Sequence, residues 1–181
     1  MSNKYYYLIA SLPLLEFGMK PPLSSEDFLT ECKKLLALQD YALVKKVLEP
    51  GDLTRPSNNK FLSQWMNFIQ NFRNELAWIR STEANKDPAN YIRGQRIDDP
   101  NIVDLLAPAV EAEDPLSAEK LLDSARWQNL DELSQWHYFD LELLIVYAIK
   151  LKILERYQEI ESPKGKELFA EYKKIEIPAL N

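Results

Sequence analysis

Glycine, cysteine and histidine are scarce in this 181-residue chain, and each shortage excludes a class of site. The four glycines are isolated, so neither the phosphate-binding pattern G-x-x-x-x-G-K-[ST] nor the dinucleotide-binding pattern G-x-G-x-x-G can be written. The single cysteine, Cys32, cannot form an internal disulfide, which is typical of a reducing compartment. One cysteine and one histidine are too few for a classical zinc site of those residues. We therefore predict no cofactor and no metal, although a carboxylate-only site for a hard cation stays open.

Long apolar runs and basic clusters are also missing. The longest nearly uncharged apolar run, Leu143–Ile149, has 7 residues, whereas a membrane span needs about 20. The formal net charge is −6 and no block of lysine and arginine interrupts it, so nucleic-acid binding is not expected. The first residues lack the pattern of a secretory signal. These features predict a cytoplasmic protein.

The residues that are abundant favour helices. The chain has 28 leucines, 14 alanines and 17 glutamates, against 5 valines and 3 threonines. Leucine, alanine and glutamate lose little side-chain freedom in a helix, whereas valine and threonine favour strands. Together with the length, this predicts an all-α fold, a compact multi-helix bundle forming a single helical domain over residues 1–181.

Several helix starts are marked by a capping side chain, in three cases just before a proline. These predicted starts are Ser24 (with Asp27 completing a capping box), Asp87 before Pro88, Asp98 or Asp99 before Pro100, Asp114 before Pro115, and Asp140. A further helix is predicted near Asp40–Leu48, and a short final one after Pro163–Gly165. The short helix that opens at Asp87 is expected to end at Gly94.

Three apolar segments supply the predicted core. Trp65–Ile79 carries large apolar residues at helical spacing. The helix after Asp140 is apolar on nearly every side in its first half, so we expect it to be central, packed against Trp65–Ile79 and the amino-terminal region. Partial burial in an oligomer interface is the alternative. Tyr5–Leu15 is aromatic and apolar on nearly every side, and its pattern fits either an extended, buried strand or a short buried helix.

Catalytic constellations are not evident. His137 lies in the run Trp136-His137-Tyr138-Phe139 ahead of a helix, where a junction role is more common than that of a general base. Cys32 is expected to be a structural thiol within a helix. The acidic run Glu111–Asp114 lacks the alternating ligands of a calcium loop and is interpreted as a solvated helix end. We predict no catalytic residues; an enzyme using carboxylates would instead need a deep acidic pocket with raised pKa values.

Four residues are candidates for partner contact. Arg73 and Arg80 are seven residues apart and share a helix face beside Asn74, a pattern that fits either a buried polar network or a contact with another protein. Trp127 and Trp136 flank polar sequence and are the stronger candidates among the tryptophans, since tryptophan often anchors protein interfaces.

Three segments resemble proteins of rotary ATPases. Asn71–Arg80, continuing to Lys86-Asp87-Pro88 and Tyr91-Ile92, resembles a pattern in the C (or d) subunit of A/V-type ATPases, with Asn74 and Arg80 at the matching positions. The helix Phe139–Arg156, with Tyr147, Lys150, Leu151 and Glu155, resembles another helix of that protein. The opening Lys4–Pro13 is similar to the start of a small uncharacterised bacterial family encoded among V-type ATPase genes.

The resemblance implies an adaptor that performs no chemistry. It suggests a shortened relative of the C (or d) subunit, acting as a non-enzymatic structural or accessory component of a bacterial V-type ATPase, for example a central-stalk adaptor between rotor axle and membrane ring. Its partners would then be V-type ATPase subunits, reached from the cytoplasmic face of the membrane. The C (or d) subunits are much longer and contain repeated helical units, so this chain can hold only part of one. A free-standing helical regulator or assembly factor that binds one protein is the alternative.

Overall fold

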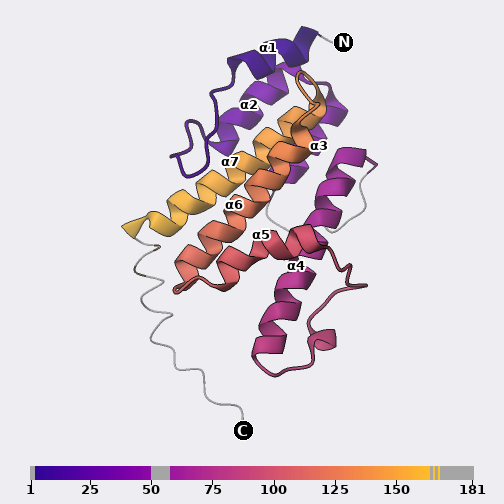
Figure 1. Cartoon of the computed structure of the whole chain (residues 1–181). Coiled ribbons are helices and arrows are strands. Elements are labelled where there is room, and N and C mark those ends of the chain that lie inside the picture. Colours follow the sequence, from indigo (N-terminus) through magenta and orange to yellow (C-terminus); the bar gives the residue numbers. More distant parts are fainter. Residues whose placement is uncertain (1–2, 50–57, 164, 166, 168–181) are drawn as a thin grey trace. The chain divides into compact units, whose positions relative to one another are not determined.

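The computed structural model describes residues 3–49, 58–163, 165 and 167. Within these residues it contains α-helices and one short 3-10 helix, η1, and no β-strand, which confirms the all-helical prediction (Figure 1). The elements are α1 (Asn3–Ser11), α2 (Ser25–Leu35), α3 (Leu38–Leu48), α4 (Lys60–Glu83), η1 (Pro88–Asn90), α5 (Pro100–Val110), α6 (Pro115–Ser134) and α7 (Leu141–Glu161). None of the helices described has both the length and the apolarity needed to cross a bilayer.

The predicted caps begin the helices where the sequence placed them. Ser24 and Asp27 form a complete capping box at the start of α2, each side chain accepting from the other residue's backbone N–H. Asp99, and not Asp98, caps α5, and Asp114 caps α6, in both cases directly ahead of a proline. Asp140 accepts a hydrogen bond from the backbone N–H of Leu143 and so caps α7. These contacts satisfy amide groups that a helix start otherwise leaves without partners.

Three segments differ from their predicted extent. The amino-terminal region that fitted strand or helix forms α1, with Leu8 buried while Tyr6 and Tyr7 stay exposed, so one face alone is covered. The helix predicted to end at Gly94 is the single 3-10 turn η1. α3 begins at Leu38, two residues before Asp40. The final helix predicted after Pro163 lies almost entirely outside the described residues.

The chain divides into two compact units. One comprises Met1–Glu49 with Tyr147–Asn181, and the other comprises Pro50–Val146. The division falls within α7, whose first residues belong to the second unit and whose later residues belong to the first. The single domain predicted over residues 1–181 stays a prediction.

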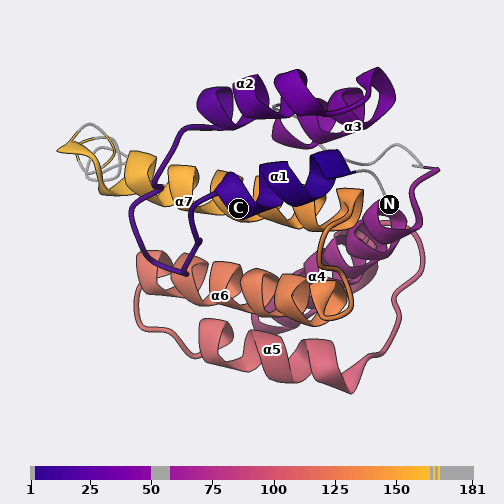
Figure 2. The same cartoon turned by 90° about the horizontal axis from the view of Figure 1, so that it is seen from above.

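The first unit is built from α1, α2, α3 and the later part of α7. α2 and α3 lie side by side in Figures 1 and 2. The rings of Phe28 and Tyr147 pack 5.0 Å apart, and the Tyr147 hydroxyl donates to the carbonyl of Pro13 at 3.0 Å. Lys152 donates from its ammonium to the carbonyl of Glu49 at 2.9 Å, just after α3. The last long helix thus packs against the amino-terminal region, as predicted.

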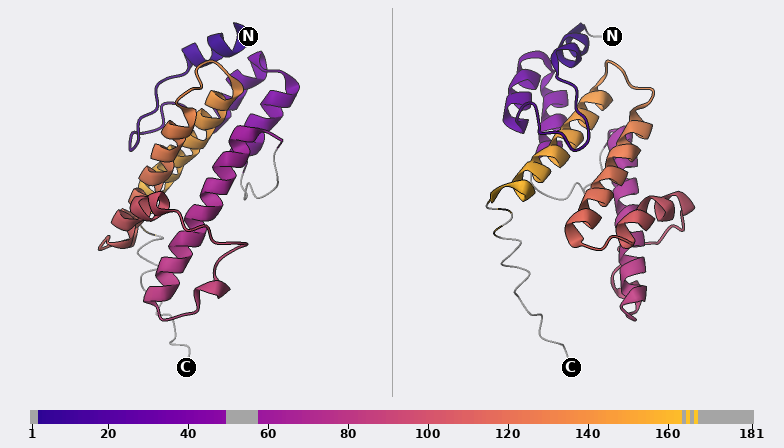
Figure 3. Two further views of the ribbon diagram at one scale, coloured as in Figure 1. Left: turned by 45° about the vertical axis from the view of Figure 1, so that its right-hand side comes forward. Right: turned by 60° about the vertical axis from the view of Figure 1, so that its left-hand side comes forward.

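The second unit is built from α4, α5, α6 and the start of α7. α5 packs against α6, and η1 lies beside the end of α4 (Figure 3). One apolar cluster joins the three helices and takes its residues from each of them. Its buried members are Phe72, Ile102, Leu106, Ala109, Leu122 and Ala125. Phe72 belongs to the predicted stripe of Trp65–Ile79, so that stripe faces the core. Packing of α7 against it stays a prediction.

Cys32 makes the first unit sensitive to alkaline pH. Burial, with a smaller contribution from the charge of Glu31, raises the pKa of Cys32 from 9.0 to about 12. Above pH 9 the unfolded chain loses this proton while the folded chain retains it, so stability is full below pH 9 and is lost as pH rises toward 12. For one group the slope is at most about 1.4 kcal/mol per pH unit. Urea unfolding of Cys32→Ala between pH 8 and pH 11 should show a shallower alkaline loss than the parent chain.

Val44→Ala is the matched control because it truncates another fully buried side chain without removing an ionisable group. It should lower stability at every pH and leave the alkaline slope unchanged. Equal slopes in the parent and in Cys32→Ala would contradict the assignment.

Candidate interaction site

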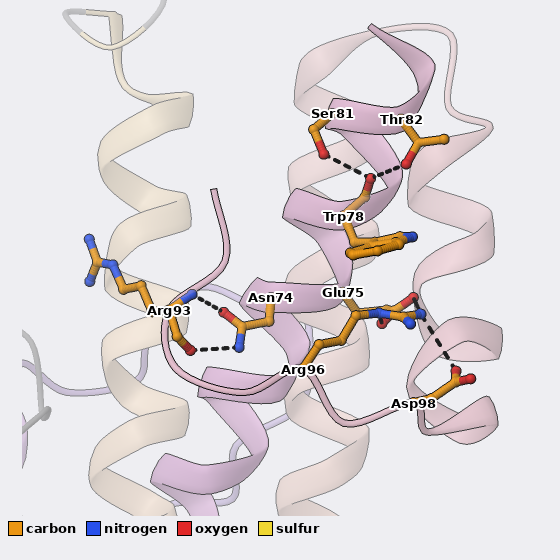
Figure 4. Close-up of polar contacts among 8 residues, drawn as sticks. All are labelled: Asn74, Glu75, Trp78, Ser81, Thr82, Arg93, Arg96 and Asp98. Carbon is orange, nitrogen blue, oxygen red and sulfur yellow. Dashed lines mark hydrogen bonds and ion pairs between the residues drawn. The ribbon is translucent and has the colours of Figure 1, made fainter. Parts of the chain in front are cut away.

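A buried amide on α4 holds the segment that follows η1. Asn74 accepts a hydrogen bond from the backbone N–H of Arg93 and donates one to the carbonyl of Arg93, both at 2.9 Å (Figure 4). Gln70, one turn earlier on the helix, donates to the same Asn74 oxygen at 2.9 Å. The side-chain amide of Asn74 thus satisfies both backbone groups of Arg93. These two hydrogen bonds fix the position of the irregular segment around Arg93.

The next residue of α4, Glu75, is buried and forms an ion pair with the half-buried Arg96 of the segment after η1. Arg96 donates to the two carboxylate oxygens of Glu75 from Nε and from a terminal nitrogen, each at 2.8 Å (Figure 4). The guanidinium also lies over the ring of Trp78, 4.5 Å from its centroid. Hydrogen bonding to Glu75 raises the pKa of Arg96 above its already high normal value. The pair neutralises a carboxylate on a residue that is only 3% exposed, and planar bidentate geometry makes this contact strong.

Both predicted arginines, Arg73 and Arg80, are exposed. The buried amide of Asn74 bonds to the backbone of Arg93, and the cation that bonds to the buried carboxylate of Glu75 is Arg96. Each arginine lines a different pocket. Arg73 lines a pocket of about 310 Å³ with Gln70, Asn74, Tyr91 and Arg93. Arg80 lines one of about 270 Å³ with Glu83, Ala109, Val110, Ala112, Glu113, Asp114, Pro115 and Ala118. Their role in partner contact stays a prediction.

Sequence patterns held no signal for Glu75, Arg93 and Arg96. Glu75 and Arg96 are 21 residues apart and lie on opposite sides of η1, so no helical periodicity relates them. The burial of Glu75 is decided by the tertiary fold, and it is this burial that requires a cationic partner for the carboxylate.

The loop between α6 and α7 presents three exposed aromatic side chains. We call residues 135–140 the aromatic loop. Trp136 is 80% exposed, Tyr138 63% and Phe139 46%. Between them, His137 turns back, with its Nδ1 2.7 Å from a carboxylate oxygen of Asp140. The histidine therefore has the junction position that the sequence predicted for it.

Trp127 is placed differently from Trp136. It is 7% exposed and is buried in α6. Asp123, Trp127 and Leu130 recur at helical spacing and are all buried, so they share the covered face of that helix. This burial does not suit the contact role predicted for Trp127, since little of its indole can reach a partner. Polar neighbours in the sequence, such as Arg126 and Gln128, are a poor guide to one helix face because adjacent residues point in different directions.

Two other predicted positions have structural roles. Cys32 is buried in α2, and its raised pKa keeps the thiol protonated at neutral pH, which is unfavourable for a nucleophile. The run Glu111–Asp114 connects two helices: Glu111 ends α5, and Asp114 caps α6 by accepting from the backbone N–H groups of Leu116 and Ser117. The acidic run is therefore a pair of helix ends, as interpreted from the sequence.

Part of the chain is similar to a known protein family. Residues 100–175 are similar to a family described as "Protein of unknown function (DUF2764)". The matched segment begins with α5 and includes α6 and α7, and it covers less than half of the chain. No curated protein and no solved structure matches. The aromatic loop lies within the matched segment, whereas Asn74, Glu75 and Arg96 precede it.

The ion pair of Glu75 and Arg96 should contribute measurably to stability. Glu75→Gln keeps the shape of the side chain but removes the bidentate carboxylate partner of Arg96, which is left with the exposed Asp98 at 3.5 Å. We therefore expect a loss of about 1–3 kcal/mol in the free energy of unfolding. Glu83→Gln, the same change at an exposed position of α4, should alter it by less than about 0.5 kcal/mol. Urea unfolding of both variants measures the difference.

A double-mutant cycle that combines Glu75→Gln with Arg96→Met tests whether the two side chains interact. If the two side chains act as a pair, the double variant should be less destabilised than the sum of the single variants. Strict additivity would contradict the pairing.

Proposed function

We propose that this protein is a non-enzymatic helical subunit or accessory factor of a bacterial V-type ATPase, and that it binds another subunit through the aromatic loop. The observation that carries the contact role is the exposure of Trp136, Tyr138 and Phe139 within four consecutive residues. The V-type ATPase assignment is supported by the resemblance of Asn71–Arg80 to the C (or d) subunit of that complex, and of Lys4–Pro13 to a small bacterial family encoded among V-type ATPase genes.

The side chains of the aromatic loop suit a protein contact. Exposed indole and phenol rings leave large apolar areas in water, and burying such an area against a partner is favourable at about 25 cal/mol per Å². Tryptophan and tyrosine are also the residues most often found as energetic centres of interfaces, since each adds a polar group to a large rigid ring. Trp136 is the most exposed aromatic side chain of the described residues and is therefore the proposed anchor.

The loop is short and is held at both sides, which favours binding. It follows the end of α6 at Ser134 and leads into α7 at Leu141. The contact of His137 with Asp140 closes it internally, and Asp140 also caps α7. The ring of Phe61 packs edge-on against His137, with centroids 5.5 Å apart. A loop ordered before binding loses less conformational entropy when a partner covers it.

A role without catalysis is supported by the contacts of three buried or half-buried carboxylates. Glu75 pairs with Arg96, and Asp123 with Arg126. In the first unit, Glu155 accepts from both the backbone N–H and the hydroxyl of Ser25 at the start of α2. Each of these carboxylates already satisfies a structural requirement of the fold. An adaptor requires this kind of rigid helical body and contact surfaces, and it requires no nucleotide site.

Location follows from the same proposal. A protein that contacts the soluble part of a V-type ATPase lies in the cytoplasm, and the complex holds it at the inner face of the membrane. Its described helices do not span the bilayer, so such an association depends on protein contacts.

Affinity purification from native cells tests the proposal. The tagged full chain should recover V-type ATPase subunits, and Trp136→Ala combined with Tyr138→Ala should reduce that recovery at least about tenfold, as expected for the loss of interface anchors. Tyr7→Ala, which removes a ring that is 62% exposed on α1, is the control and should leave recovery unchanged.

Two other results would change or refute the proposed function. Recovery of unassembled subunits, with the protein absent from the mature complex, would favour an assembly factor over a resident subunit. If no V-type ATPase subunit is enriched over an untagged control, the proposal is wrong, whether or not another partner appears.

A further inference from the structure

We infer that His137, Asp140 and Glu142 form a binding site for one divalent transition-metal ion, with Zn²⁺ as the best match. Each residue offers one ligand atom, and these atoms all lie within 4.8 Å of one another. All three residues are half-buried, so a solvated ion can reach them. The site is independent of the contact role proposed for the neighbouring aromatic side chains.

The distances are close to what a metal requires. Zinc binds imidazole nitrogen and carboxylate oxygen at about 2.0–2.2 Å, which places two ligand atoms of a tetrahedral site about 3.4 Å apart. His137 Nδ1 and the Asp140 oxygen are 2.7 Å apart, and they now face each other as hydrogen-bond partners. An ion between them replaces the shared proton and moves the two atoms slightly apart. The ligand oxygen of Glu142 lies within 4.8 Å of both other ligand atoms.

The charges of the group favour a cation. Asp140 and Glu142 together carry two negative charges, and the start of α7 offsets only about half of one. No lysine or arginine among residues 58–146 forms an ion pair with either carboxylate in the part of the chain described. The imidazole of His137 is the one other group of the cluster that can carry charge. One bound divalent cation therefore balances the group more fully than one proton does.

The surroundings already orient two of the three ligands. Asn59 donates from its amide to Glu142 at 3.2 Å, while its other side-chain atom, Oδ1, caps α4. The edge-on ring of Phe61 restricts the plane of the His137 imidazole. Such second-layer contacts are typical of metal ligands, since they lower the entropy lost when the ion binds. Asp140 uses one oxygen for the helix cap and retains the other for the ion.

The donor set determines the class of ion. One nitrogen and two carboxylate oxygens suit Zn²⁺, Co²⁺ or Ni²⁺ better than Mg²⁺ or Ca²⁺, which prefer oxygen ligands alone. Three protein ligands leave at least one position for water. Because the ligands come from the aromatic loop and the first turn of α7, a bound ion joins the two and limits the movement of Trp136.

Titration calorimetry of the metal-free full chain with ZnCl2 tests the site. We expect one ion per chain, and Co²⁺ should give the visible absorption of a low-symmetry site with nitrogen and oxygen ligands. His137→Gln and Glu142→Gln should each weaken binding at least about tenfold. Asp140→Asn is the third ligand variant and retains a capping side chain, so loss of binding there does not reflect loss of the helix. Far-UV circular dichroism checks that each variant is folded.

The control is Asp104→Asn, which removes one negative charge at an exposed position of α5. It should bind Zn²⁺ like the parent chain. Absence of binding to the parent chain, binding that all three ligand variants retain, or an equal loss in Asp104→Asn would overturn the proposal. If Mg²⁺ binds as tightly as Zn²⁺, the imidazole is not a ligand and the site is not the one described.

Discussion

Burying a carboxylate without a partner costs a small helical protein much of its folding free energy. In the second unit the bidentate contact between Glu75 and Arg96 offsets that cost. Glu75 lies on a helix whose neighbouring face is apolar, so α4 can pack on α5 and α6 only if this charge is neutralised. Arg96 is brought to it by an irregular segment that Asn74 fixes through two backbone hydrogen bonds. The packing of the three helices and the course of residues 91–99 therefore depend on each other.

Polar side chains at the helix ends also make more than one contact each. Asp140 caps α7 with one oxygen and contacts His137 with the other, and Asn59 caps α4 while also contacting Glu142. In the first unit, Glu155 stabilises the start of α2, and Lys152 donates to carbonyl groups at and just beyond the end of α3. Burial lowers the pKa of Lys152, and the carbonyl groups offset part of that cost by stabilising its charge. Side chains distant in sequence thus satisfy backbone groups that local structure leaves open.

The contact role and the metal site concern neighbouring residues but rest on different properties. Contact depends on the apolar area of Trp136 and Tyr138 that is left in water. Metal binding depends on the charge and spacing of His137, Asp140 and Glu142. Either property can exist without the other. Together, the two proposals describe an aromatic surface whose order responds to a bound ion.

The sequence alone determined what depends on a few consecutive residues. Side-chain torsional preferences made the fold all-helical, and the caps at Ser24, Asp114 and Asp140 set helix starts because a capping oxygen reaches amides only two or three residues ahead. The exposed position of Trp136 also agreed with its place in a short junction. Only tertiary structure decided that the amino-terminal segment is helical, that Trp127 is buried, and that Glu75 meets Arg96. Those outcomes depend on which faces of distant helices pack together and on ion pairs between residues far apart in the chain. No local pattern of residues specifies either of these.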